Sequence, residues 1–270
     1  MPAQPTVEDL VSQVGATPKY AAINPALVRR LVEQELARGR SPKEIVKTVR
    51  SRLHQVAGAY QETPIGYVQA GIELDSLPTD LHHPAVTAYC QKMLLRHAST
   101  RERLPFLSEF YQQTLASIAP VHSVLDLACG LNPLAIAHLP LAAGAPYTAC
   151  DIYSDLAGYL NQFFAHFSIP GTASICDLAA AIPDQSVHLA LLLKTIPCLE
   201  QLDKTIGPRL LKAIRADHIL VSFPARSLGG HAKGMPRTYE AHFRQLMEGL
   251  PFTVQRFEFP TELAFLLSRT

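Results

Sequence analysis

The feature that most constrains the fold is an alternation of short apolar runs with helical segments in the second half of the chain. The apolar runs span residues 124–127, 147–152, 173–176, 187–193 and 218–223. The segments with helical spacing between them span residues 134–139, 155–167 and 199–214. Short apolar runs bounded by turn signals are typical of buried strands. Strands that alternate with helices form a parallel sheet with helices on both faces, so we predict a doubly wound α/β fold from residue 121 onward.

The end of the chain breaks this alternation. Residues 252–259 and 262–267 have the pattern of two strands, and only Pro260-Thr261 separates them. A connection this short leaves no room for a helix, so we predict that the mostly parallel sheet ends in an antiparallel hairpin.

The N-terminal part of the chain is predicted to be helical and basic. Asn24-Pro25 begins one helix, and Ser41 with Glu44 forms a capping box at the start of a second. Between residues 16 and 60, nine basic residues oppose three acidic ones, whereas residues 121–199 contain one basic and five acidic residues. Lys43, Lys47 and Arg50 share one side of the second helix. This pattern favours a polyanion-binding unit attached to a ligand-binding domain, although a solvated helical surface gives the same pattern.

We place the boundary of these units at residue 83. Residues 61–83 contain two prolines, with Pro84 directly after them, and no clear period, and we interpret them as a linker. A helix is expected over residues 84–96, and a second capping box, Ser99 to Glu102, predicts another helix after it. The expected units are therefore 1–83 and 84–270.

Polar residues follow three of the predicted strands where ligands bind in open α/β sheets. Gly130 follows the first strand, Asp151 ends the second, and Asp177 ends the third. A carboxylate at Asp151 suits a ribose diol, and one at Asp177 suits an adenine amino group. The glycine-rich pyrophosphate loop is missing, which favours S-adenosylmethionine over a dinucleotide. The alternative is that both aspartates only cap the following helices.

A second constellation lies in residues 222–237, which combine basic residues with three glycines and contain no acid. Arg226, His231 and Lys233 fit contacts with an RNA backbone, and Phe223 and Met235 fit contacts with a base. The alternative is an ordinary connecting loop.

Several strings in this chain resemble one family. They are HASTRER at 97–103, VLDLACGLNP at 124–133, SFPARSLGGHAKGM at 222–235 and Thr261-Glu262-Leu263, together with the basic helices at 18–35 and 41–54. They resemble the Arm/Rmt aminoglycoside-resistance 16S rRNA (guanine-1405, N7) methyltransferases over nearly the whole chain. The resemblance implies a class I Rossmann-like methyltransferase fold with an N-terminal helical rRNA-docking domain.

The resemblance also implies site residues and a reaction. Cofactor contacts are expected at His97, Ala98, Ser99, Thr100, Arg101, Glu102, Arg103, Ala128, Gly130, Asp151, Ile152, Asp177, Leu178 and Leu193. Arg103 would hold the methionine carboxylate, Asp151 the ribose and Asp177 the adenine. Contacts with RNA are expected at Lys19, Lys43, Lys47, Arg50, Arg52, Arg226, His231 and Lys233, with Phe223 and Met235 helping to position the base.

The expected substrate is 16S rRNA within the 30S subunit. Guanine N7 carries a lone pair and no proton, so no catalytic acid or base is expected. An adenine-N1 rRNA methyltransferase uses the same chemistry and stays open as an alternative. So does an RNA-binding protein with a vestigial methyltransferase fold, or a small-molecule methyltransferase.

The composition of the chain excludes several other classes of protein. With 48% hydrophobic and 17% charged residues the chain is globular, not disordered. No apolar run is long enough to span a membrane, and residues 1–10 lack the pattern of a signal peptide. Five cysteines with no CxxC pair predict a reducing cytoplasm and no metal site. We expect a monomer.

Overall fold

The computed structural model describes residues 5–58, 64–225 and 235–270. Its N-terminal helices are α1 (Val7–Gly15), α2 (Pro18–Ala21), α3 (Pro25–Ala37) and α4 (Pro42–Leu53), followed by a π-helical turn (His54–Gly58). We call residues 5–58 the N-terminal helical unit. The predicted caps of α3 and α4 are confirmed, because Asn24 Oδ1 accepts the N–H of Ala26 at 2.9 Å and Ser41 and Glu44 form the capping box.

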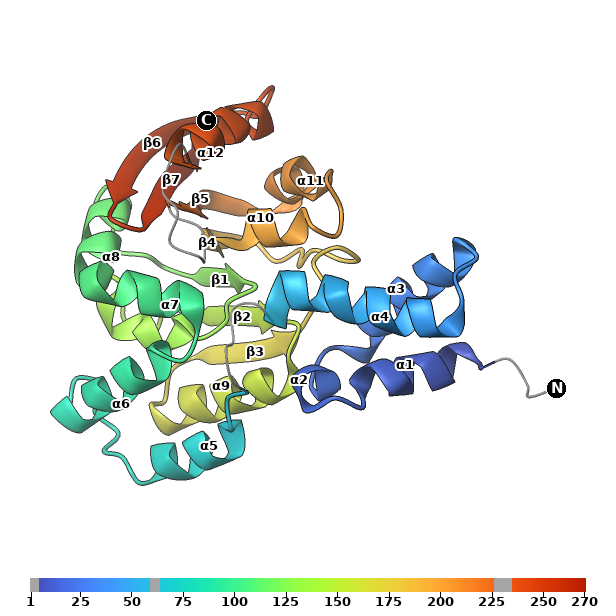
Figure 1. Cartoon of the computed structure of the whole chain (residues 1–270). Helices are drawn as coiled ribbons and strands as arrows, with labels where there is room; N and C mark the ends of the chain where they lie inside the picture. Colours follow the sequence, from blue (N-terminus) through green and yellow to red (C-terminus); the bar gives the residue numbers. More distant parts are fainter. Residues whose placement is uncertain (1–4, 59–63, 226–234) are drawn as a thin grey trace.

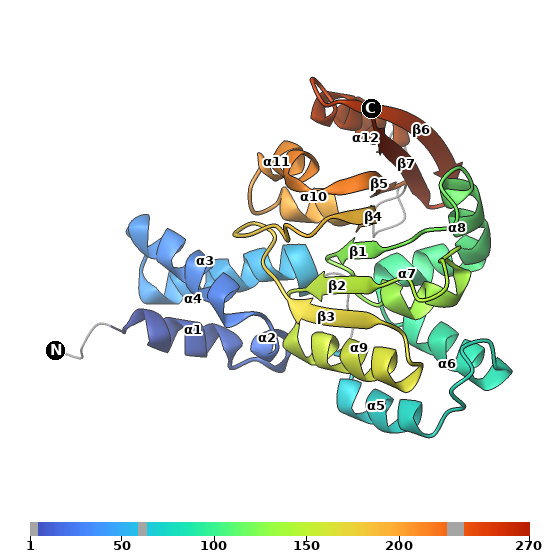
Figure 2. The same ribbon diagram turned by 180° about the vertical axis from the view of Figure 1, so that it is seen from behind.

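A seven-stranded sheet forms the centre of the rest of the chain (Figures 1 and 2). Its strands are β1 (Val124–Leu127), β2 (Tyr147–Asp151), β3 (Gly171–Ile175), β4 (Val187–Leu193), β5 (Ala216–Pro224), β6 (Phe252–Phe259) and β7 (Glu262–Arg269). Their order is β3-β2-β1-β4-β5-β7-β6. The first five strands are parallel, and β7 and β6 are antiparallel, which confirms the predicted fold class.

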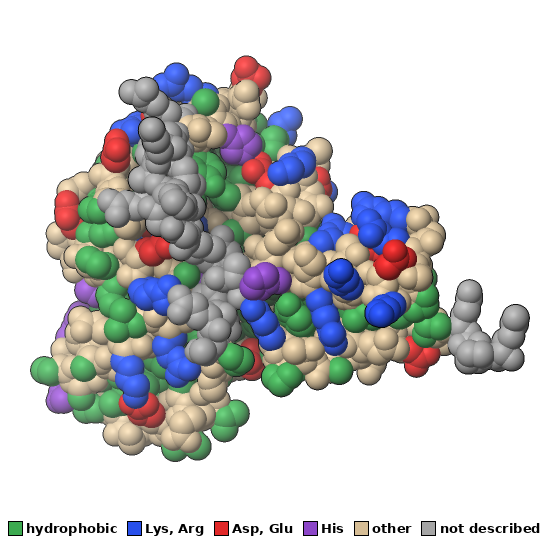
Figure 3. Space-filling view, in the orientation of Figure 1, with side chains coloured by type: hydrophobic (Ala, Val, Ile, Leu, Met, Phe, Trp, Pro, Cys, Tyr) green, Lys and Arg blue, Asp and Glu red, His purple; other side chains and the backbone are tan. Residues whose placement is uncertain are grey.

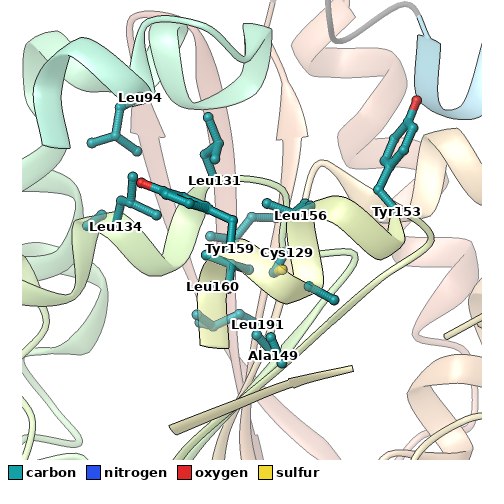
Figure 4. Packing of buried hydrophobic residues seen from close by; sticks show 14 of the residues in the cluster. Leu94, Cys129, Leu131, Leu134, Ala149, Tyr153, Leu156, Tyr159, Leu160 and Leu191 are labelled. Carbon is teal, nitrogen blue, oxygen red and sulfur yellow. The ribbon is translucent and has the colours of Figure 1, made fainter. Parts of the chain in front are cut away.

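Helices cover both faces of this sheet. They are α5 (Tyr67–Asp75), α6 (Pro84–Leu94), α7 (Ala98–Arg103), α8 (Leu107–Leu115), α9 (Ser154–His166), α10 (Thr195–Leu199), α11 (Ile206–Ala213) and α12 (Met235–Leu246), with 3-10 turns at Leu104–Phe106 and Asn132–His138. Neighbouring strand residues belong to different cores: Leu191 packs with α9 and α6, and Leu192 with α10 and α11. Figure 4 shows the first core, where Tyr159 and Leu160 of α9 lie over Leu191.

Three local expectations were wrong. The interval 61–83 contains α5, which packs on α9 where the rings of Tyr67 and Tyr159 lie 5.3 Å apart. The helix assigned to a Ser99 cap begins at Ala98, because the Thr100 hydroxyl donates back to the Leu94 carbonyl oxygen at 2.6 Å. The helix expected over 199–214 is shorter, because α10 already ends at Leu199 and α11 covers only Ile206–Ala213.

The N-terminal helical unit lies beyond the carboxyl ends of β1 and β2 (Figures 1 and 2). The backbone N–H of Asn24 donates to the Ile152 carbonyl at 2.8 Å, and that of Ser154 donates to the Ala22 carbonyl at 2.8 Å. These bonds join the unit directly to the loop after β2. The boundary at residue 83 stays a prediction. Among residues 5–58, 64–225 and 235–270, no helix combines the length and apolar character needed to cross a bilayer.

Candidate active site

A pocket opens at the carboxyl ends of β1, β2, β3 and β4. Strand order reverses there, between β1 and β4, which is where ligands bind in doubly wound sheets. Its empty volume is about 820 Å³, including the open mouth, which is enough for a nucleoside-sized ligand. The predicted cofactor residues that line it are His97, Ser99, Ala128, Gly130, Asp151, Ile152, Asp177, Leu178 and Leu193.

Asp151 shapes the turn after β1. Its Oδ2 accepts the backbone N–H of Gly130 at 2.9 Å, and its Oδ1 accepts the N–H of Ile152 at 2.7 Å. Gly130 has a φ of +50°, and a Cβ there would meet the His97 ring at 3.1 Å, so a side chain would be strained and crowded. Burial raises the pKa of Asp151, and the backbone N–H donors oppose that shift. The carboxylate therefore holds the glycine turn in addition to lining the pocket.

Asp177 is held from both sides. Its Oδ2 accepts two hydrogen bonds from Arg30 of α3, at 2.9 Å from Nε and 2.7 Å from Nη2, and its Oδ1 accepts the N–H of Ala179 at 3.0 Å. The bond to Ala179 has the geometry of the cap that we considered as the alternative for this residue. Because Asp177 also lines the pocket, this cap leaves the predicted ligand role open.

A buried group of charges, formed by Lys194, Glu102 and Glu262, adjoins the pocket. Lys194, which lines the pocket, is 4% exposed; its Nζ donates to Glu102 at 2.6 Å and lies 3.6 Å from Glu262. Burial favours a raised pKa for Glu262, but Arg103 and Lys194 outweigh it and hold the pKa below its ordinary value. An ammonium group beside two carboxylates can accommodate an amino acid headgroup.

Arg103 is paired within the protein and is not part of the pocket wall. Its guanidinium is buried and donates to both carboxylate oxygens of Glu262, at 3.0 and 2.6 Å, and to Asn132 Oδ1 at 3.1 Å. It does not line the pocket, so the assignment of Arg103 to the methionine carboxylate is not supported by this geometry. Lys194 has the position for that contact.

The remaining residues of the 97–103 string have mixed positions. Ala98 and Thr100 are buried and do not line the pocket, whereas Arg101 and Glu102 are partly exposed beside it. Burial, with Arg103 and Lys194, lowers the pKa of His97 to about 4, so this ring is neutral at physiological pH.

The structure adds pocket residues that sequence reasoning missed. They are Leu27, Val56, Cys150, Tyr153, Leu156, Cys176, Lys194, Thr195, Cys198, Leu199 and Leu202. The sequence could have pointed to Lys194 as a pocket residue, because it is the one Lys or Arg in 121–199 and directly follows a predicted strand. Leu27 and Val56 belong to the N-terminal helical unit, and nothing local in the sequence relates them to the sheet.

The residues predicted to contact the target nucleotide are only partly described by the structure. Arg226, His231 and Lys233 lie outside the described residues, and Met235 is the first residue of α12. Phe223 requires a correction: it is fully buried, stacked on Tyr239 at 5.3 Å and packed edge-on against Phe243 and Phe265. A ring inside this aromatic core is not available to stack on a base.

The basic residues of the N-terminal helical unit differ in how accessible they are to a ligand. Lys and Arg side chains gather over α3 and α4 (Figure 3). Lys43 and Lys47 are exposed, and Lys19 Nζ lies 3.0 Å from His54 Nδ1.

Arg50 and Arg52 are already engaged within the protein. Arg50 donates to the carbonyl oxygens of Gln13 and Val14 at the end of α1. Arg52 is 16% exposed and contacts the buried Glu35 at 3.2 Å. Arg52 thus stabilises the helical unit, and the RNA contacts of Arg50 and Arg52 stay predictions, whereas Lys43 and Lys47 are exposed and available to a polyanion.

Within the described part of the chain, no group of three or more His, Cys, Asp or Glu side chains is arranged to hold a metal ion.

Comparison with known proteins places this geometry in a family. The family described as "Ribosomal RNA methyltransferase (FmrO)" matches residues 16–266. A relative from Frankia casuarinae, named 16S rRNA (guanine(1405)-N(7))-methyltransferase, is 36% identical over 267 residues, which is 97% of this chain and 94% of the relative. The crystal structure of the 16S rRNA methyltransferase RmtF with S-adenosyl-L-homocysteine has a TM-score of 0.84 at 30% identity, with both chains covered completely. The 16S rRNA methylase RmtB has a TM-score of 0.81 at 30% identity and covers 98% of this chain and 99% of its own. The predicted resemblance is confirmed, and this chain belongs to the ribosomal RNA methyltransferase (FmrO) family.

Proposed function

We propose that the protein transfers a methyl group from S-adenosylmethionine to N7 of guanine 1405 in 16S rRNA of the 30S subunit, and so confers aminoglycoside resistance. The observation that carries this proposal is the pocket at the reversal of strand order, with Asp151 and Asp177 at the ends of β2 and β3 and Lys194 after β4. The name of the relative from Frankia casuarinae supports the choice of base.

The residues fit the methyl donor. Asp151 accepts hydrogen bonds from a ribose diol, and Asp177 accepts one from an adenine amino group. Leu178, Leu193 and Leu199 supply apolar walls for the base. Lys194 pairs with the carboxylate of the methionine part, and Glu102, already 2.6 Å from Lys194, balances the charge. Bound there, the donor supplies an electrophilic methyl group on a sulfonium.

The protein's task is then positioning rather than proton transfer. Guanine N7 attacks with its own lone pair, so no side chain has to remove a proton. The neutral His97 and the apolar walls limit water around the reacting groups. Holding two reactants in a near-attack arrangement can supply roughly 7 kcal/mol or more of the barrier reduction.

Two surfaces recognise the substrate in this proposal. Lys43 and Lys47, with Lys19, dock on rRNA phosphates. Arg226, His231 and Lys233, with Met235 beside them in sequence, contact the flipped nucleotide. The protein works as a monomer in the cytoplasm, where the 30S subunit is available.

The test combines binding with methyl transfer. Calorimetry with S-adenosylhomocysteine is expected to show one site, and tritium from labelled S-adenosylmethionine is expected to enter 16S rRNA of purified 30S subunits. Lack of cofactor binding would support the vestigial RNA-binding alternative. Cofactor binding with label in a small molecule, and none in 30S subunits, would contradict the rRNA substrate.

A further inference from the structure

An ion pair joins the N-terminal helical unit to the cofactor pocket. Arg30 of α3 donates twice to Oδ2 of Asp177, at 2.9 and 2.7 Å. The Asp177 side chain is 8% exposed and that of Arg30 is 28% exposed, so water screens this pair less than it screens a surface pair. The residues lie 147 positions apart in the chain.

This pair restricts the Asp177 carboxylate. Oδ2 receives both bonds from Arg30, while Oδ1 receives one from the Ala179 backbone and keeps capacity for a further donor. A carboxylate fixed at both oxygens loses little conformational freedom when a ligand binds to it, and such preorganisation favours affinity.

The same unit supplies part of the pocket wall. Leu27, one turn before Arg30 on α3, lines the pocket, and so does Val56 after α4. The backbone bonds from Asn24 to Ile152 and from Ser154 to Ala22 tie α3 to the loop after β2. A ligand in this pocket therefore touches both the sheet edge and the helical unit that carries Lys43 and Lys47.

We propose that Arg30 is a positioning residue that holds Asp177 for the adenine and couples cofactor binding to docking of the N-terminal helical unit on the ribosome. This inference rests on the proposed function. A bound cofactor contacts both the helical unit and the sheet and so fixes their relative position. A 30S subunit that binds both surfaces then loses less conformational freedom on binding, and its affinity rises. By linkage, binding to the 30S subunit raises the affinity for the cofactor by the same factor.

Calorimetry with S-adenosylhomocysteine tests the first half on the full-length protein. Arg30→Gln is expected to bind about 5- to 10-fold more weakly, within the usual range of coupling between sites. Arg30→Lys is expected to recover part of this loss, because lysine keeps the charge but not the planar fork. Arg29→Gln is the matched control, because Arg29 lies next in the same helix but pairs with Glu8 and is 46% exposed. Its affinity is expected to match wild type.

Binding to 30S subunits with and without saturating S-adenosylhomocysteine tests the second half. The wild-type protein and Arg29→Gln are expected to bind about 5-fold more tightly with the cofactor product present, whereas the ratio for Arg30→Gln is expected to fall to about one. Thermal unfolding without ligand shows whether Arg30→Gln is folded, and Arg30→Lys replaces it if it is not.

Two results would overturn the inference and leave the proposed function intact. One is an Arg30→Gln affinity equal to that of Arg29→Gln. The other is a 30S affinity of the wild-type protein that does not respond to S-adenosylhomocysteine. Failure of the wild-type protein to bind S-adenosylhomocysteine would instead contradict the proposed function itself.

Discussion

Asp151 accepts the N–H of Gly130 across the turn that follows β1, and it also lines the pocket. This double engagement explains why its position could be predicted from sequence. The carboxyl end of β2 lies beside the glycine turn that follows β1, which places Asp151 next to Gly130. The carboxylate has enough lone pairs to accept the backbone N–H and the hydroxyls of a ribose at the same time.

Asp151→Ala is expected to weaken binding of S-adenosylhomocysteine. Loss of charge-assisted hydrogen bonds costs about 1.5–3 kcal/mol, or roughly 10- to 100-fold in affinity. Asp155→Ala is the control, because Asp155 follows in the next helix but does not line the pocket. Equal affinities of the two variants by calorimetry would argue against the ribose assignment.

Asp126 lies deeper, in β1, where it accepts hydrogen bonds from the Tyr147 hydroxyl at 2.6 Å and the Asn132 amide at 2.8 Å. Burial raises the pKa of Asp126 from 3.8 to about 7, against these two bonds. The native state therefore keeps a proton that the unfolded chain releases, so the free energy of unfolding falls as pH rises from about 4 to about 7.

Asp126→Asn is expected to remove this contribution. Urea unfolding between about pH 5 and about pH 8 should show wild type losing stability relative to the variant, by at most about 1.4 kcal/mol per pH unit, up to pH 7. Parallel pH profiles of the two proteins would mean that Asp126 titrates normally.

At the scale of elements, a buried ion pair joins α7 to β7. Arg103 is 1% exposed and Glu262 is fully buried, and both nitrogens on one edge of the guanidinium meet the carboxylate. Asn132 then connects Arg103 to Asp126, so the pair continues into the hydrogen bonds of β1.

Glu262→Gln is expected to lower the free energy of unfolding by about 3–5 kcal/mol, because it leaves the Arg103 charge buried without compensation. The control is Glu258→Gln in β6, whose partner Arg256 is 40% exposed; its effect should stay within about 0.5 kcal/mol. Denaturant unfolding at pH 7 measures both. A loss for Glu262→Gln no larger than that of the control would contradict the structural role of the pair.

Helix α4 presents Lys43 and Lys47 to solvent. Reversing both to Glu is expected to weaken 30S binding and to lower its salt dependence by about 0.9 in the logarithmic slope for each lost phosphate contact. Affinity for S-adenosylhomocysteine should not change. The matched control reverses Lys212 and Arg215, which are exposed at the opposite edge of the sheet, where β5 begins. Equal 30S affinities of the two double variants would exclude a docking role for α4.

The sequence predicts elements better than contacts. Every predicted strand was found, because a buried strand leaves an apolar run that needs no knowledge of its neighbours. The capping signal at Ser99 failed because Thr100 found a partner in the preceding helix. Arg103 was assigned to a ligand on the resemblance, and local sequence gave no sign of its ion-pair partner Glu262, which lies 159 positions away. Arg30 and Asp177 are likewise distant, and only the fold brings them together.

At the scale of the whole molecule, the N-terminal helical unit and the pocket lie at the same edge of the sheet, where β1 to β4 end. The carboxyl ends of β1, β2 and β3 point toward α3 and α4 in Figures 1 and 2, and the basic side chains of these helices gather on the face shown in Figure 3. A large RNA substrate can therefore contact the helical unit while one nucleotide reaches the mouth of the cofactor pocket. Such an arrangement suits methylation of a base within an assembled subunit.

The position and chemistry of the methylated base decide whether this protein modifies guanine N7 in 16S rRNA. Wild-type protein is incubated with 30S subunits and S-adenosylmethionine, and the extracted 16S rRNA is treated with borohydride and aniline, which cleave RNA at N7-methylguanine. We expect a single new cleavage at guanine 1405, absent when the Asp151→Ala variant is used. Tritium in the rRNA without this cleavage, together with a reverse-transcription stop typical of N1-methyladenine, would contradict this expectation and establish the adenine alternative.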